Sequence, residues 1–297
     1  DHAVTEFVRV SGTLLPPRAF RRISPELLAG SATSSGTPVR VQLLGSDPVC
    51  MADNAAQLAA LGPAGVDLNF GCPAPTVNRH RGGAALLDEP ELLYAIACAV
   101  RAAVPASIPF TAKMRLGVSD TAKALDCARA LAAGGVAGLV VHARTKTDGY
   151  RPPAHWEWVG RIADVVSVPV VANGEVWNED DWRRCRSVSG ATDVMRGRGA
   201  VADPFLVRRI RQGGEAPADR DAEWAELLPL IGEFWQRVLA KVEARHAPGR
   251  LKQWLKLLRR NFPQGEILYA AVRAKSDVAS VSQVLAAHGI PFLKAAA

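Results

Sequence analysis

Short β-branched runs alternate with helical patterns over most of this sequence, and this alternation restricts the fold more than any other feature. Regular alternation of strands and helices predicts an α/β fold with a parallel sheet. Strands are expected at 5–10, 38–45, 66–71, 110–117, 138–145, 168–175 and 192–200. Helices are expected at 53–62, at 88–104 with Asp88 as N-cap, and at 120–135, 179–188 and 203–214.

Two parallel α/β folds compete, the open doubly wound sheet and the closed eight-stranded barrel. A barrel gathers all its strand ends on one rim, whereas an open sheet concentrates ligand groups at one switch point. No G-x-G-x-x-G motif opens this chain, and almost every strand ends in polar residues or glycine. We therefore predict a TIM (β/α)8 barrel. The strand-end residues are Gln42, Asn69, Cys72, Lys113, Arg115, His142, Arg144, Asn173, Glu175, Gly197 and Arg198.

The strand count is one short of a complete barrel. The first recognisable strand begins at residue 5, and no initiator methionine precedes Asp1. We expect the missing first strand to lie upstream of Asp1.

After residues 213–224 the strand pattern ends and long amphipathic helices follow. We place a domain boundary near residue 217, giving a barrel domain at 1–216 and a helical domain at 217–297. The helical stretch 249–262 interleaves Trp254 and leucines with cations, which fall partly on different helical faces. Those cations are Arg250, Lys252, Lys256, Arg259 and Arg260. They form either a solvated basic face or a surface for a phosphate backbone.

Composition excludes several classes of protein. Lys and Arg outnumber Asp and Glu by 36 to 29, a net charge of +7 that favours an anionic partner but also occurs in ordinary basic enzymes. The five cysteines are scattered, without a CxxC pair or zinc-type spacing. Apolar runs are too short for a membrane span, and the first ten residues resemble no signal peptide. We expect a cytoplasmic protein without a structural metal.

Two glycine-rich loops, at 172–175 and 195–200, follow the last two strands. In barrels this pair of loops often binds phosphate through backbone N–H groups and a nearby helix N-terminus, here offered by 203–210. Alternatively, the glycines only allow the chain to turn.

Lys113 and Arg115 lie two residues apart in one strand and therefore share a face. Two inward cations need an anion or an electron-rich ring, and a flavin suits them because a lysine stabilises negative charge on the reduced ring. The alternative is a surface ion pair at the strand end. His142 is either a phosphate or flavin ligand or a rim histidine.

Cys72 ends the strand 66–71 between a glycine and a proline. A nucleophilic cysteine needs a base close by, and no histidine is adjacent in the sequence. An unactivated thiol stays mostly protonated at neutral pH, so Cys72 is better placed to donate a proton than to attack.

In this order and spacing, the motifs "NFGCP", "AKMR", "VHART", "ANGE" and "GRG" make the sequence resemble the tRNA-dihydrouridine synthases, from about residue 4 to about residue 290. The segments "TEFVRV", "VRVQLLG", "VDLNFGCPAPTVN", "GRLKQWLKLLR" and "AAVR" resemble the bacterial class C enzymes, which reduce uridine 16 in the D-loop of tRNA. The resemblance implies an FMN-binding barrel with a helical tRNA-binding domain and NADPH as reductant. Separately, we expect a monomer without a metal.

The resemblance also implies roles for individual residues. Cys72 matches the catalytic cysteine, which donates a proton to C5 of the uracil while the reduced FMN gives hydride to C6. FMN-contacting positions match Gln42, Lys113, His142, Asn173, Gly174, Glu175, Gly197 and Arg198. Positions around the target uridine match Asn69, Arg115 and Tyr150, and the tRNA-orienting cations match Arg9, Arg250, Lys252 and Arg273.

This sequence departs from the family pattern in two places. Leu257 stands where the class C signature has an aromatic residue, and the family's first strand, with its flavin-packing loop, has no match. Two other functions stay open: a flavin barrel acting on a free pyrimidine, as in dihydroorotate-type oxidoreductases, and an inactive tRNA-binding factor. The basic helices argue against the first. Intact Cys72 and Lys113 argue against the second, whereas the missing first strand argues for it.

Overall fold

The computed structural model describes residues 1–213 and 219–292 of the chain. The chain divides into two compact units, one formed by 1–175 and 183–195, the other by 176–182 and 196–297. The predicted domain boundary near residue 217 lies outside the described residues. The division into domains at 1–216 and 217–297 therefore stays a prediction.

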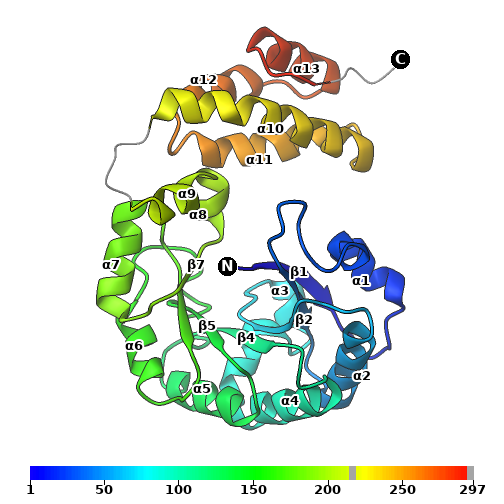
Figure 1. Cartoon of the computed structure of the whole chain (residues 1–297), viewed down its shortest axis with the longest axis vertical. Coiled ribbons are helices and arrows are strands. Elements are labelled where there is room, and N and C mark those ends of the chain that lie inside the picture. The colour runs from blue at the N-terminus through cyan, green and yellow to red at the C-terminus, as the bar shows by residue number, and fades with distance from the viewer. Residues whose placement is uncertain (214–218, 293–297) are drawn as a thin grey trace. The chain divides into compact units, whose positions relative to one another are not determined.

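The first unit is built on a parallel sheet of seven strands, in which each strand pairs with the next one along the chain (Figure 1). Its strands are β1 (Ala3–Arg9), β2 (Val39–Leu44), β3 (Val66–Phe70), β4 (Phe110–Arg115), β5 (Leu139–His142), β6 (Val170–Asn173) and β7 (Val194–Met195). The predicted parallel α/β fold is confirmed, and sequential pairing in a curled sheet is the order found in a TIM barrel. Among the described strands, no pairing joins β7 to β1.

Helices cover the convex face of this sheet (Figure 1). They are α1 (Pro17–Ile23), α2 (Pro48–Ala59), α4 (Pro90–Ala103), α5 (Ala124–Ala133), α6 (Glu157–Ala163) and α7 (Glu179–Ser189), the last of which crosses from one unit to the other. The short helix α3 (Pro75–Asn78) lies in the segment that follows β3. Apolar residues of the strands face these helices. On β3, for example, Val66, Leu68 and Phe70 are almost completely buried. The alternating residues Asp67 and Asn69 therefore share the opposite, polar face of the strand.

Three local predictions were wrong. Asp88 does not cap α4, because Glu89 is the N-cap and Asp88 ends a 3₁₀ segment, Gly83–Asp88. The last strand contains only Val194–Met195, because the glycine-rich segment after it turns into the short helix α8 (Arg198–Ala202). The helix predicted at 203–214 is shorter, and α9 spans Leu206–Arg211.

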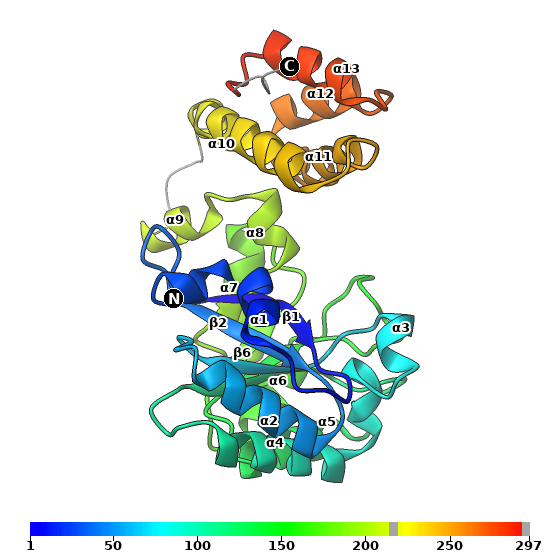
Figure 2. The same ribbon diagram turned by 90° about the vertical axis from the view of Figure 1, so that its right-hand side faces the viewer.

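The second unit continues with four longer helices, α10 (Arg220–Lys241), α11 (Ala247–Leu258), α12 (Pro263–Val272) and α13 (Val278–Ala287). Helix α10 lies beside α11, as Figure 2 also shows. Trp235 of α10 is completely buried in the core of this unit. On α11, Leu251, Leu255 and Leu258 are buried at helical spacing, which confirms the predicted amphipathic face.

Candidate flavin and uridine site

The loop that carries Cys72 is fixed by hydrogen bonds on two sides. Asn69 Oδ1 accepts hydrogen bonds from the N–H groups of Gly71 and Cys72, both at 2.9 Å. Asn78 Nδ2 donates to the Cys72 carbonyl at 2.8 Å. Gly83 packs against the loop with a φ of +61°, and a Cβ there would lie 2.7 Å from the Cys72 carbonyl oxygen. The backbone of Cys72 is therefore held in one position after β3.

The thiol of Cys72 is held less tightly than its backbone. The residue is partly exposed. Among the described residues, no side chain forms a hydrogen bond with its Sγ atom. No described histidine is therefore placed to take its proton, as activation of a nucleophilic cysteine would require.

Gln42 and Lys113 lie beside Asn69 on the polar face of the sheet. Asn69 pairs with Lys113 in the register of β3 and β4, and Gln42 pairs with Asp67 in that of β2 and β3. Asn69 Nδ2 donates to Gln42 Oε1 at 2.6 Å. The structure thus brings together three of the predicted site residues, Gln42, Asn69 and Lys113.

The ammonium group of Lys113 forms no hydrogen bond or ion pair with a described side chain. Burial and, to a smaller extent, the charge of Arg115 lower its pKa from 10.5 to about 8, against the opposing effect of Asp67. A cation in these surroundings is stabilised by an added electronegative ligand.

Arg115 binds backbone rather than offering a free guanidinium. It is 1% exposed. Its Nε atom donates to the Gly71 carbonyl at 2.8 Å, and its Nη1 donates to the carbonyls of Thr145 and Gly149 at 2.8 and 2.9 Å. The guanidinium also lies 5.3 Å from the ring centre of Tyr150, which is 54% exposed. Arg115 therefore joins the Cys72 loop to the loop that presents Tyr150.

His142 and Asn173 are register partners at the ends of β5 and β6. Asn173 Nδ2 donates to the Met195 carbonyl of β7 at 2.9 Å. Gly174 follows with a φ of +118°, and a Cβ at this position would lie 2.9 Å from His142 Cδ2. Only glycine allows the backbone to approach the imidazole this closely.

Arg144 was noted in the sequence only as a polar strand-end residue, and its partner was missed. It is completely buried and forms an ion pair with Glu175, a non-glycine residue with a φ of +57°. Arg144 Nε donates to the Pro153 carbonyl at 3.2 Å, and its buried Nη1 has no partner. Glu175, a predicted flavin position, is thus held by a buried arginine. The only sequence signal for this role of Arg144 was its position two residues after His142, on the same predicted strand.

Gly197 and Arg198 belong to the second unit and are described within it. The guanidinium of Arg198 lies 5.1 Å from the centre of the Trp177 ring, and that of Arg260 lies 4.0 Å from the same ring. Arg196 precedes this loop, and burial lowers its pKa. Its buried Nη1 has no hydrogen-bond partner, so the loop has donor capacity left for an anion.

Arg9, a predicted tRNA-binding residue, lies near the Cys72 loop. Its Nη2 atom donates to the Thr76 carbonyl in α3 at 3.3 Å. Arg9 also lines a surface hollow with Ser46, Asp47 and His80. The exposed arginine is thus anchored by one hydrogen bond, with donors left for other groups.

The other predicted tRNA-binding residues lie in the second unit. Arg250 on α11 and Arg273 at the C-cap of α12 are exposed, whereas Lys252 is partly buried. Leu257, where an aromatic residue was expected, is also partly buried on α11. On α11, Arg250 is therefore exposed outside the row of buried leucines.

The polar face of the first unit fits a flavin. Lys113 has no hydrogen-bond or ion-pair partner among the described residues, the backbone of Gly174 packs closely against His142, and Arg144 holds Glu175. These groups include a cation, an imidazole and amides, which can contact the ring carbonyls and nitrogens of a flavin. No described helix is both long and apolar enough to cross a membrane. Over 1–213 and 219–292, no three His, Cys, Asp or Glu side chains are grouped as metal ligands.

Comparison with known proteins identifies close relatives. The chain is 58% identical over 288 residues to a tRNA-dihydrouridine(16) synthase of Aquipseudomonas alcaligenes, covering 96% of this chain and 91% of the relative. It is 57% identical over 285 residues to a protein of the same name from Pseudomonas putida, covering 96% and 88%. A solved variant of NCR from Zymomonas mobilis shares the fold at 16% identity and a TM-score of 0.50, covering 73% of this chain and 77% of that one.

The model of the dihydrouridine synthase family matches residues 1–286, nearly the whole chain. This match agrees with the curled parallel sheet and with the motifs that suggested the resemblance. The protein is therefore a flavin-dependent oxidoreductase that belongs to the dihydrouridine synthase family.

Proposed function

We propose that this chain reduces uridine 16 in the D-loop of tRNA to 5,6-dihydrouridine, using FMN and NADPH. The observation that carries the proposal is the Cys72 loop, whose backbone is fixed while its free thiol forms no hydrogen bond with a described side chain. The relatives with identities of 57% and 58% are named for this position in tRNA.

Several residues of the chain would hold the flavin. Lys113 supplies the cation, Gln42, His142 and Asn173 supply polar contacts, and Gly174 and Glu175 shape the loop. Gly197 and Arg198 are proposed to contact the phosphate. When bound and reduced, the flavin supplies a hydride to C6 of the uracil.

Cys72 provides the matching proton. Its Sγ–H donates to C5 of the uracil, so that one hydride and one proton saturate the C5–C6 bond. Asn69 fixes the backbone that carries the thiol, because its Oδ1 accepts hydrogen bonds from the N–H groups of Gly71 and Cys72. Arg115 fixes the Gly71 carbonyl and supports Tyr150, which we place beside the uridine.

The base must leave its stack to reach this site, because a stacked uracil cannot enter a barrel mouth. Positively charged side chains would contact the phosphates of the surrounding RNA. We assign this role to Arg9, Arg250, Lys252 and Arg273. We also expect a monomer in the cytoplasm, where tRNA is modified.

Mapping of dihydrouridine in tRNA tests the proposal. A strain without this gene should lose dihydrouridine at position 16 alone, and the wild-type gene should restore it. A strain that keeps dihydrouridine at position 16, with no other enzyme able to form it, would refute the proposed specificity. Expression of the Cys72→Ala variant in the same strain tests the role of the thiol, because this variant should leave position 16 unmodified.

A further inference from the structure

Asp67 lies in β3 and is not among the proposed flavin-, uridine- or tRNA-binding residues. It is 2% exposed, and it lies between the buried residues Val66 and Leu68. An acidic residue is rarely buried unless its carboxylate is well satisfied. Two short hydrogen bonds satisfy it here. Gln42 Nε2 donates to Oδ2 at 2.6 Å, and Thr111 Oγ1 donates to Oδ1 at 2.6 Å.

The three residues form one row across the sheet. Gln42, Asp67 and Thr111 are register partners on β2, β3 and β4. Asn69 lies two residues beyond Asp67 on the same face of β3. The row therefore lies directly next to the residues that position Cys72.

A continuous series of hydrogen bonds runs from Asp67 to the Cys72 loop. Asp67 accepts from Gln42 Nε2, Gln42 Oε1 accepts from Asn69 Nδ2, and Asn69 Oδ1 accepts from the backbone. Backbone N–H groups can only donate, so the loop end fixes the orientation of the Asn69 amide. At the other end, Oδ2 of the Asp67 carboxylate can only accept, which fixes the orientation of the Gln42 amide.

Reversal of either amide would break the series. With Gln42 turned over, its Oε1 would face an Asp67 oxygen and its Nε2 would face Asn69 Nδ2. Like atoms would then oppose each other at two contacts that are now 2.6 Å long. Buried hydrogen bonds are costly to leave unmade, so the carboxylate favours one arrangement of both amides.

Charged groups surround this carboxyl. Burial raises the pKa of Asp67, while hydrogen bonds from Thr111 and Gln42 and the nearby cations Lys113 and Arg40 lower it. A protonated Oδ1 would face Thr111, and Oδ2 would still accept from Gln42. The orientation of the amides is therefore the same in both protonation states.

We propose that Asp67 is a positioning residue for proton transfer, which fixes Gln42 and Asn69 and through them the place of the Cys72 thiol. This inference rests on the proposed function and adds a residue that acts without touching the uridine. This series of hydrogen bonds gives the buried carboxylic acid of Asp67 a role in the position of the Cys72 loop.

The test uses Asp67→Asn, which keeps the shape of the side chain but offers an amide that can turn either way. Its matched control is Thr111→Val, which removes the other hydrogen bond of the same carboxylate and leaves the series to Cys72 intact. Both variants are assayed as flavin-loaded enzymes in two separate steps: reduction of the flavin by NADPH, and its reoxidation by unmodified tRNA.

We expect Asp67→Asn to slow reoxidation by tRNA about tenfold or more, since general acid catalysis contributes about 10²–10⁴-fold and depends on placement of the acid. Reduction by NADPH, flavin content and the tRNA concentration for half-maximal rate should change less than about threefold. Thr111→Val should change both steps less than about threefold. Equal slowing of both steps, equal loss in the two variants, or loss of flavin would overturn the proposal.

A second measurement needs neither flavin nor tRNA turnover. The rate at which iodoacetamide alkylates Cys72 is followed by mass spectrometry, with Cys50 as internal standard. We expect Asp67→Asn to change the Cys72 rate about threefold or more, with no change at Cys50. If this variant does not fold, Gln42→Asn replaces it, because its side chain is too short to span Asp67 and Asn69. An unchanged rate of Cys72 alkylation would overturn the positioning role of Asp67, even if the wild-type enzyme proved inactive on tRNA.

Discussion

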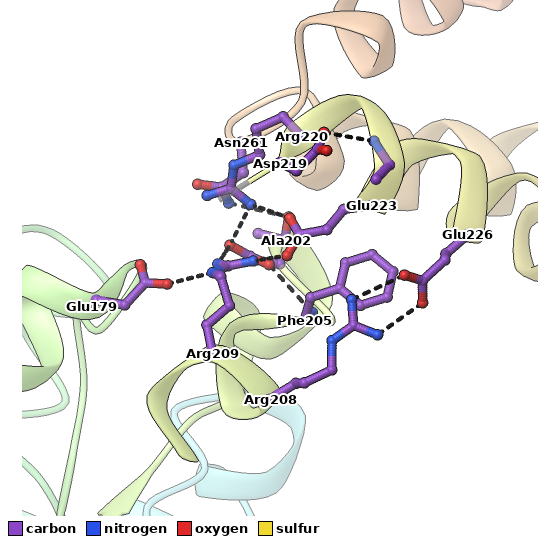
Figure 3. Close-up of polar contacts among 12 residues, drawn as sticks. Glu179, Ala202, Phe205, Arg208, Arg209, Asp219, Arg220, Glu223, Glu226 and Asn261 are labelled. Atoms are coloured by element: carbon purple, nitrogen blue, oxygen red, sulfur yellow. Dashed lines mark hydrogen bonds and ion pairs between the residues drawn. The ribbon is translucent and has the colours of Figure 1, made fainter. Parts of the chain in front are cut away.

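Each of the two units surrounds a cation with polar groups, but the two cations differ in how fully protein groups satisfy them. In the second unit, Arg209 forms ion pairs with Glu179 and Glu223, as Figure 3 shows, and a third with Asp203. Burial alone would lower the pKa of Arg209, but these hydrogen bonds raise it above its ordinary value. In the first unit, Lys113 has no described partner and its pKa falls to about 8.

This difference separates a structural cluster from a binding site. The Arg209 cluster also includes Arg220, whose Nη1 donates to Asp203 at 3.0 Å and to Glu223 at 2.9 Å. Its charges are paired within the unit, and its contacts join α9 to α10 and to the start of α7. Lys113 and the Cys72 thiol instead keep capacity for groups that the chain does not provide.

The largest expected effect is on catalysis. Cys72→Ala should reduce dihydrouridine formation about 10²-fold or more, because a general acid contributes about 10²–10⁴-fold. The yellow flavin should stay bound, because Lys113 and the Gly174 loop are unchanged. Turnover is measured by mass spectrometry of digested tRNA, and flavin content by absorbance. Cys50→Ala is the control, and unchanged turnover in Cys72→Ala would refute the role of the thiol.

The next effect is on stability. Arg209→Met removes the central cation and leaves three carboxylates with fewer partners, which should cost about 3 kcal/mol of unfolding free energy. Arg208→Met is the matched control, since its ion pair with Glu226 is exposed and should matter little. Denaturant unfolding measures both variants. Equal stability of the two would show that the Arg209 cluster is not a structural element.

A smaller effect on turnover is expected from substitution of Gly83, which packs against the backbone of the Cys72 loop. Gly83→Ala places a Cβ 2.7 Å from the Cys72 carbonyl oxygen at a φ of +61°, so the loop must shift. We expect turnover to fall about tenfold, because the rate depends on the position of the catalytic group and drops when that group is displaced by a fraction of an ångström. Gly62→Ala has a similar φ of +68° and open space around it, so it measures the backbone strain alone. Equal turnover of the two variants would contradict a fixed loop.

The smallest effect concerns pH. A bound flavin with negative charge favours the ammonium form of Lys113, whose pKa in the free protein is about 8. Flavin affinity should therefore be highest below pH 8 and should fall as the pH rises, by up to about tenfold per pH unit. Fluorescence titration of the flavin at several pH values measures this dependence. The Lys113→Met variant should bind more weakly and should lose the dependence; a variant that keeps it would place the titrating group elsewhere.

The sequence predicted the elements and the strand-end residues because both follow local patterns. Strand runs, turn residues and the Cys72 motif are each contained within about ten residues. Asp67 is visible in the sequence as an acidic residue between two apolar residues of a strand, but its partners Gln42 and Thr111 depend on the register of three strands. Such pairings across the sheet are not visible in one sequence.

Two further features were not predictable for related reasons. Arg115 was expected beside the uridine, and its nearly complete burial follows from three backbone carbonyls in distant loops. The helix at 203–214 was interpreted as support for a phosphate. In the structure its Arg209 is engaged with carboxylates from α7, α10 and Asp203. The presence of an arginine in the sequence therefore shows neither how deeply its side chain is buried nor which groups it contacts.

The most direct test of the central claim uses purified flavin-loaded protein, NADPH and unmodified tRNA. Dihydrouridine is then mapped at each position of the D-loop. We predict one dihydrouridine per tRNA, at position 16, with no reduction of free uridine under the same conditions. Reduction at another position, or of the free nucleoside at a comparable rate, would contradict the assignment.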